Sequence, residues 1–291
     1  AGQGAAVRGP EGLVLHQRGM NFPIGHFLEQ GHIALLRVFH AAKQFNLMFV
    51  LKPEHAEAHR NGDIHIHDMD FAPMGTTTCT QIDLIKLFHN GFSTGHGYLR
   101  EPNAISSYAA LACIAIQSNQ NDQHGGQSVV NFDYGMADGV KKTFVRLYRQ
   151  NLARALMLLS GLEDPESELK GVIAGIGEKQ DLQPTLEGCG DYFAAERLAL
   201  APRFGEEAEI QKAQEFAHYR AVKETDRATY QAMEALIHNL NTMHSRAGAQ
   251  TPFSSINYGM DTSPEGRMVM KNIMPCRRSP SPGGPLYNIA G

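Results

Sequence analysis

The sequence predicts an α/β protein, because short strand-like segments are separated by long helical ones. Strand composition or alternation is found in residues 63–68, 129–134 and 252–259. Apolar residues at helical spacing are found in residues 27–49, 140–159 and 206–244, and an apolar, alanine-rich run typical of a buried helix covers residues 105–117. Residues 162–205 give no clear pattern.

The first part of the chain is expected to follow the order helix, turn, strand. A first helix is predicted over residues 27–49 and a second, short one over residues 53–59. Asn61-Gly62 comes next, a dipeptide that favours a turn. The strand predicted for residues 63–68 follows it directly.

Polar residues alternate along this predicted strand, GDIHIHD. A strand would place Asp63, His65 and His67 on one face, which is more typical of a site than of a solvated edge. The spacing of the two histidines matches the H-x-H pairs that bind metals. It is equally compatible with one hydrogen-bonded core histidine and one that lines a cleft. The spacing leaves both interpretations open.

Cys79 is the leading candidate for a reactive residue. It lies in TTTCTQIDL, where the three threonines favour extended structure. A lone cysteine is most often a buried structural thiol. A histidine brought close from the preceding strand, either His65 or His67, would instead tune a thiolate or transfer a proton. Asp83, at the end of the segment, is compatible with a ligand or a helix cap.

A polar loop is predicted for residues 117–128, directly before a strand at 129–134. Its glycine pair would let the backbone approach a sugar or phosphate, although a plain turn is an equal alternative. The loop lacks the lysine and spacing of a Walker motif, and no GxGxxG follows a strand. Candidate substrate-binding residues are Gln127 and Ser128 in this loop, together with Asn257 in the strand predicted for residues 252–259.

The composition narrows the class of protein. The chain has 291 residues, 42% of them hydrophobic, and carries 26 basic and 30 acidic residues for a net charge of -4. Without a dense basic run, a nucleic-acid-binding surface is not expected. Neither a membrane span nor a secretory leader is found, so we expect a cytoplasmic protein. The four cysteines, at positions 79, 113, 189 and 276, form no C-x-x-C pair, which argues against a zinc ribbon or a disulfide scaffold.

Two functions from different classes fit the residues taken alone. One is a metal-dependent hydrolase on an α/β barrel, with His65 and His67 as ligands and an aspartate as base. The other is a non-catalytic nucleotide-binding or dimerisation remnant. Stoichiometric zinc that is lost on substituting both histidines would favour the first. Nucleotide binding measured by calorimetry, without any catalysed reaction, would favour the second.

Several long motifs, in the same order, make the chain similar to a known family. They are GDIHIHDMDF, CTQIDL, GFSTGHGYLREPNAISS, AIQSNQNDQHGGQSVVNFDYGMA and ALIHNLNTMHSRAGAQTPFSSINYGMDTSPEGRM. Together they cover most of residues 45–160 and 215–272. The chain resembles the anaerobic, oxygen-sensitive class III ribonucleoside-triphosphate reductases, which are glycyl radical enzymes.

The resemblance implies a fold. The family has a ten-stranded α/β barrel made of two half-barrels, and this chain looks like the first half-barrel with long flanking helices. Residues 1–272 are then a partial catalytic barrel domain, and residues 273–291 form an irregular tail that departs from the family pattern. Cys276 lies in a context similar to that of the family's thiyl cysteine, but it follows the PEGRM motif too soon for that role.

The resemblance also implies a reaction, the reduction of ribonucleoside triphosphates by radical chemistry. A glycyl radical, at a site outside this chain, is installed by an activating enzyme that uses S-adenosylmethionine and an iron–sulfur cluster. A thiyl radical then removes the 3′ hydrogen, the 2′ hydroxyl leaves as water, and formate is the reductant. Cys79 matches the family's second active-site cysteine, and His65 matches a histidine beside it.

Partners and further cofactors follow from the same resemblance. We expect nucleotide effectors, a homodimer, and a structural zinc in a C-terminal region that this chain lacks. No metal site is expected within the chain. On its own the chain is expected to be inactive, because the glycyl radical region is absent from it.

Overall fold

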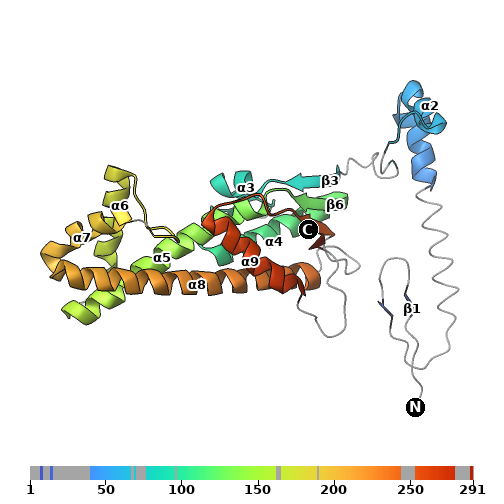
Figure 1. The fold of residues 1–291 in the computed structure, drawn as a ribbon. Helices are drawn as coiled ribbons and strands as arrows, with labels where there is room; N and C mark the ends of the chain where they lie inside the picture. The colour runs from blue at the N-terminus through green and yellow to red at the C-terminus, as the bar shows by residue number, and fades with distance from the viewer. Residues whose placement is uncertain are drawn as a thin grey trace, which may run out of the picture. The chain divides into compact units, whose positions relative to one another are not determined.

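The computed structural model describes residues 7–8, 14–15, 40–66, 69, 77–95, 97–161, 165–188, 190–243, 253–278 and 289–290. The chain divides into two compact units, Ala1–Thr76 and Thr77–Gly291 (Figure 1). Within the described residues, no helix combines the length and the apolar content needed to cross a membrane.

The described residues of the first unit are mostly helical. Its elements are the antiparallel pair β1 (Val7–Arg8) and β2 (Val14–Leu15), the π-helical turn η1 (Asn46–Val50) and α2 (Pro53–Asn61). Helix α2 begins with proline, which suits the first turn, and ends at Gly62, whose φ of +84° favours glycine. The predicted helix at residues 53–59 and the turn after it are therefore confirmed.

The strand predicted for residues 63–68 is wrong over its described part, residues 63–66. The chain here completes the end of α2 instead, because the backbone N–H groups of Asp63 and Ile64 both donate to the carbonyl of Ala58. A further N–H, that of Ile66, donates to Nδ1 of His59 at 3.2 Å. His65 therefore lies in a helix-terminating turn, and the strand alternation does not apply to it. His67 lies outside the described residues.

The second unit contains a parallel sheet with the strand order β3–β6–β7–β8. Its strands are β3 (Thr77–Ile82), β6 (Gln123–Val129), β7 (Ser254–Ile256) and β8 (Ile289–Ala290), and a separate hairpin joins β4 (Phe92–Ser93) to β5 (Tyr98–Leu99). Long helices lie between the parallel strands in the sequence, because parallel strands need a long crossover connection. The predicted α/β class is confirmed in this coarse form.

Seven helices of the second unit are described. They are α3 (Leu84–Asn90), α4 (Ile105–Asp122), α5 (Phe132–Ser160), α6 (Glu166–Gln180), α7 (Gly190–Phe204), α8 (Glu207–Thr242) and α9 (Pro264–Arg278). Helices α5 and α8 lie side by side over much of their length (Figure 1). The long helix predicted for residues 206–244 is confirmed, as is the end of α5 at Gly161, whose φ is +66°.

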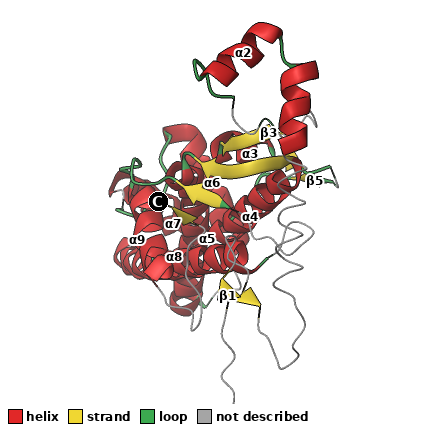
Figure 2. Cartoon of the chain, turned by 90° about the vertical axis from the view of Figure 1, so that its right-hand side faces the viewer, coloured by secondary structure: helices red, strands yellow, loops and turns green. Residues whose placement is uncertain are grey.

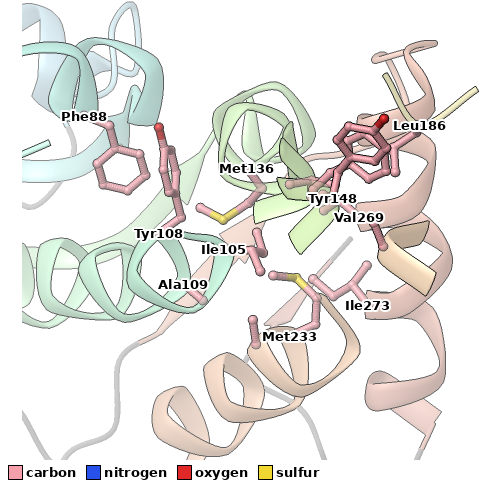
Figure 3. Close-up of a cluster of buried hydrophobic side chains, with 14 of the residues drawn as sticks. Phe88, Ile105, Tyr108, Ala109, Met136, Tyr148, Leu186, Met233, Val269 and Ile273 are labelled. Carbon is pink, nitrogen blue, oxygen red and sulfur yellow. The ribbon is translucent and has the colours of Figure 1, made fainter. Parts of the chain in front are cut away.

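Helices cover one face of the sheet (Figure 2), and the core lies partly between the two and partly among the helices themselves. Ile82, Val129 and Ile256 are paired across three strands, and all three are buried against the helices. Further from the sheet, the side chains of Ile105, Met136, Met233 and Ile273 converge from four helices (Figure 3). Helices α4 and α5 approach closely because residue 139 is glycine: a Cβ there would lie 2.7 Å from the ring of Tyr108.

The polar loop predicted for residues 117–128 and the strand predicted for 129–134 are wrong. Helix α4 continues through Asp122, β6 occupies residues 123–129, and α5 begins at Phe132. The prediction treated the amides of this segment as solvent-exposed. In fact three of these amides are buried between α4 and the sheet, those of Gln120, Gln123 and Gln127. A buried segment is normally recognised by its apolar residues, and these polar side chains do not give that signal.

A second group of buried polar residues joins α5, α7 and α8. Glu196 is completely buried and accepts hydrogen bonds from the hydroxyls of Tyr148 and Tyr192, at 2.5 and 2.7 Å, and from Nε2 of Gln214 at 2.7 Å. Burial raises the pKa of Glu196, although these three hydrogen bonds oppose the change. We call these four residues the Glu196 cluster.

Helix α9 runs past the position at which an irregular tail was expected. Ile273 and Cys276 are buried, and the thiol of Cys276 lies 3.2 Å from the carbonyl oxygen of Asn272. Residues 279–288 lie outside the described residues. The division into a catalytic domain and a tail stays a prediction.

Candidate functional site

The face of the sheet opposite the helices is polar. Gln81, Ser128 and Ser255 are register partners on β3, β6 and β7, and each follows or precedes a residue that is buried on the helix side. Strand alternation therefore points these three side chains to the other face. Gln81 is exposed and the two serines are half-buried. We call this surface the open face, because the described residues leave it accessible.

Cys79 lies on β3, within the predicted extended segment, and is exposed. It has a left-handed backbone conformation, with φ of +52°, which is rare for a residue with a side chain. The two other cysteines with described side chains, Cys113 and Cys276, are buried. Burial raises the pKa of the Cys113 thiol to about 11, and burial followed by the charge of Glu234 raises that of Cys276. Of these three thiols, only Cys79 is accessible.

Two of the three predicted substrate-binding residues come together on the open face. Nδ2 of Asn257 donates to Oγ of Ser128 at 3.4 Å. The backbone holds Asn257 in place, because its N–H donates to the carbonyl of Val129 at 2.8 Å and its carbonyl accepts the N–H of Phe132 at 3.1 Å. An exposed amide and a hydroxyl at the end of parallel strands provide hydrogen-bonding groups for a polar ligand.

Gln127, the third predicted residue, lies on the helix-covered side of β6. It is 4% exposed, and its Oε1 accepts a hydrogen bond from Nδ2 of Asn119 on α4 at 2.8 Å. Its Nε2 is buried and makes no hydrogen bond with the described part of the chain. The structure separates its side chain from those of Ser128 and Asn257, and its role in binding substrate stays a prediction.

Asn131 connects the carboxyl ends of β3 and β6. Its Oδ1 accepts the N–H of Leu84 at 3.2 Å, and its Nδ2 donates to Oδ1 of Asp83 at 2.7 Å. Asp83 caps α3 by accepting the N–H groups of Ile85 and Lys86. The bond from Asn131 is the main cause of the lowered pKa of Asp83. Of the two roles compatible with the sequence, Asp83 has that of a helix cap.

Asp133 is a structural residue of the site that the sequence did not reveal. It is 1% exposed, and its Oδ2 accepts the backbone N–H groups of Gly259, Met260 and Asp261 at 2.8–2.9 Å. Burial alone would raise the pKa of Asp133, but the backbone N–H groups outweigh it and lower that pKa. The carboxylate fixes the chain that leaves β7, beginning two residues after Asn257. The sequence contained one signal for this residue, because an aspartate in the first turn of a helix, as Asp133 is in α5, is favoured by the helix dipole.

His65 belongs to the first unit and is exposed. Its ring lies 5.6 Å from that of His59, at an interplanar angle of 39°. Desolvation, and then the charges of Lys43 and His65, lower the pKa of His59, which suits the acceptor role of its Nδ1. Because His65 and Cys79 belong to different units, their expected proximity stays a prediction. Among the described residues, no three His, Cys, Asp or Glu side chains are grouped to hold a metal ion.

Residues 33–279 match the family model for the anaerobic ribonucleoside-triphosphate reductase. Curated relatives carry that same name. The relative from Enterobacteria phage T4 is 25% identical over 236 residues, which are 81% of this chain and 28% of the relative. Those from Escherichia coli and Salmonella typhimurium are each 24% identical over 234 residues, which are 80% of this chain and 25% of the relative. The chain thus spans about a quarter of the length of these relatives.

Proposed function

Because the chain belongs to the anaerobic ribonucleoside-triphosphate reductase family, we propose that it forms part of a catalytic subunit that reduces ribonucleoside triphosphates to deoxyribonucleotides. The observation that carries this proposal is the position of Cys79. It is an accessible thiol on a strand of the parallel sheet, with a backbone conformation that ordinary strands do not adopt. Strained residues of this kind cluster at functional sites.

In the proposed reaction Cys79 is the second cysteine of a radical pair. Its S–H bond is weak enough to give a hydrogen atom to a ribose radical, which the hydroxyls of Ser128 and its neighbours cannot do. His65 transfers the proton that lets the 2′ hydroxyl leave as water. Formate supplies the two electrons and is converted to carbon dioxide, so that the reduction is balanced.

The groups that hold the nucleotide are proposed to be Ser128 and Asn257, with Gln127 beneath them. The first two are supported by their hydrogen bond and their place on the open face. Uncharged hydrogen-bonding groups suit ribose hydroxyls, which both donate and accept. The buried amide of Gln127 supports the strand that carries Ser128, through its bond with Asn119.

The parallel sheet is proposed to be part of the first half of a ten-stranded barrel, with residues 1–272 as the partial catalytic domain and 273–291 as a tail. A polar open face agrees with this, because such a face would line the interior of a closed barrel and be covered there. Radical intermediates require such cover, since a site closed to water prevents side reactions.

The remaining components are proposed to act from outside this chain. They are the glycyl radical, the activating enzyme with S-adenosylmethionine and its iron–sulfur cluster, a structural zinc, nucleotide effectors and a second copy of the subunit. A cytoplasmic location completes the proposal.

The decisive test is Cys79→Ala in the complete reductase. Deoxynucleotide formation is expected to fall to background, while the electron paramagnetic resonance signal of the glycyl radical persists after activation. Cys113→Ala is the matched control, because that thiol is buried in the core and lies away from the open face. Normal turnover by the Cys79→Ala enzyme would contradict the assigned role.

A further inference from the structure

The pairing of β3 with β6 is interrupted opposite Cys79. Between Thr78 and Thr80, β3 advances two residues, while β6 advances three, from residue 124 to residue 127. The additional residue makes a β-bulge in β6. Gly125 lies within it and has φ of +98°, which glycine adopts without steric cost.

The second glycine of the bulge is tightly enclosed. A Cβ on Gly126 would lie 3.3 Å from the ring of Phe253, the residue before β7. The carbonyl of Phe253 accepts the N–H of Gln127 at 3.2 Å, directly after the bulge. The neighbouring strand thus closes one side of the bulge.

Gln123 holds the bulge from the helix-covered side. Its side chain is completely buried, and its Nε2 donates to the carbonyls of Gly125 and Gly126, at 3.4 and 3.3 Å. Its Oε1 is also buried and has no hydrogen bond to any described residue. A buried amide with an unmet acceptor costs stability, so an apolar residue would serve the core better. What the amide provides is a bridge between the two bulge carbonyls.

The backbone of Cys79 needs such support. Cys79 and Asp181 are the two non-glycine residues with positive φ in the described part of the chain. Asp181 is the cap of α6, where a left-handed residue is expected. Cys79 lies within a strand, where this conformation is strained and persists only if its surroundings impose it. The surroundings at this point are the bulge of β6.

We infer that Gln123 is a positioning residue for Cys79. By bridging the carbonyls of Gly125 and Gly126, it maintains the mismatch of one residue between the strands, and β3 accommodates that mismatch at Cys79. Cys79 is thereby held in the left-handed conformation in which its thiol is exposed. The importance of this arrangement for catalysis rests on the proposed function, but the arrangement itself can be tested without turnover.

The test is selective carbon-13 labelling of cysteine in the full chain, with the Cys79 signal assigned by Cys79→Ser. The Cα and Cβ shifts report the backbone conformation, and the wild-type Cys79 signal is expected at the values of a helical or left-handed residue. In Gln123→Leu it should move to the values of an extended strand. The rate at which iodoacetamide alkylates Cys79 should fall by roughly fivefold or more, as the exposure of the thiol is lost.

Gln214→Leu is the matched control, because Gln214 is also a buried amide that donates to a backbone carbonyl, in this case that of Phe193. It should lower the melting temperature but leave the Cys79 signal and alkylation rate unchanged. Equal changes in both variants would overturn the inference, as would strand-type shifts in the wild type or an unchanged signal in folded Gln123→Leu.

If Gln123→Leu does not fold, Gly125→Val tests the same bulge from the backbone. Its control is Gly95→Val, since Gly95 also has a positive φ, of +90°, but lies in open space in a loop. A shift in the Cys79 signal is expected for Gly125→Val alone, and its absence would overturn the inference. These experiments measure the conformation and the alkylation of Cys79 and do not measure deoxynucleotide formation. A failure of the proposed function and a failure of the inference therefore give different results.

Discussion

The open face and the Glu196 cluster are both polar, but their polar groups are used in opposite ways. The Glu196 cluster is fully buried, and its carboxylate accepts three hydrogen bonds from three different side chains. The open face is accessible, the hydrogen bond between Ser128 and Asn257 on it is long, and Cys79 has a strained backbone. A satisfied, buried network contributes to a unique structure, whereas accessible polar groups on a rigid sheet remain available to a ligand.

The largest expected effect breaks the buried side of this comparison. Glu196→Leu leaves the hydroxyls of Tyr148 and Tyr192 and the amide of Gln214 without their acceptor, and it should lower the free energy of unfolding by about 3–5 kcal/mol. Urea denaturation measures this loss. The alkylation rate of Cys79 should not change under native conditions. A loss below about 1 kcal/mol would show that the network is not satisfied as described.

A smaller loss is expected at the boundary between the two regions. Asp133→Ala removes the carboxylate that accepts three backbone N–H groups after β7, and should cost about 2–3 kcal/mol. Because Asn257 lies two residues before that segment, hydrogen exchange of the amides of residues 257–261 should also increase. Asp226→Ala is a suitable control, since Asp226 accepts from the side chains of Lys271 and Asn272 rather than from the backbone. Equal exchange in the two variants would contradict the role given to Asp133.

The two buried carboxylates should respond to pH with opposite signs. The pKa of Asp133 is lowered from 3.8, so its contribution to stability is present above pH 3.8 and is lost as the pH falls through its folded pKa. The pKa of Glu196 is raised from 4.5, so its contribution is present below pH 4.5 and is lost as the pH rises through its folded pKa. The free energy of unfolding, measured from acid to neutral pH, should therefore fall at both ends of the range. In Asp133→Asn the fall at low pH should be smaller than in the wild type. In Glu196→Gln the fall at higher pH should be smaller.

The smallest effect on stability is expected on the open face. Asn257→Ala removes one exposed hydrogen bond of 3.4 Å and should change the free energy of unfolding by less than about 1 kcal/mol. In the complete reductase the same change should weaken nucleotide binding, which calorimetry with a ribonucleoside triphosphate would measure. An unaltered affinity would remove Asn257 from the proposed site and leave the comparison to rest on Cys79.

Elements with strong local signals could be predicted from the sequence. The apolar spacing of α8 and the glycine after α5 suffice to place those helices, and the threonines before Cys79 place an extended segment. The strand at residues 63–66 failed because an alternating pattern of six residues is weaker than the hydrogen bonds that end α2. The prediction of a polar loop at residues 117–128 failed because the buried side chains of that segment are amides.

Most of the site depends on contacts between residues far apart in the chain. Cys79, Ser128 and Asn257 could be proposed from residue type and family motifs, but the bond between the last two requires the pairing of β6 with β7. Asp133 binds a segment about 126 residues later in the chain, and no local pattern encodes that contact. The bulge opposite Cys79 arises from a mismatch between two strands, so neither strand shows it alone.

The position of β3 at the end of the strand order β3–β6–β7–β8 has a practical consequence. An outer strand presents its unpaired backbone groups as a template on which another chain can form a strand. If β3 stays unpaired beyond the described strands, concentrated preparations of this chain should form intermolecular β-structure along the strand that carries Cys79. Dilute samples with a monitored hydrodynamic radius are the appropriate material for measuring the reactivity of that thiol.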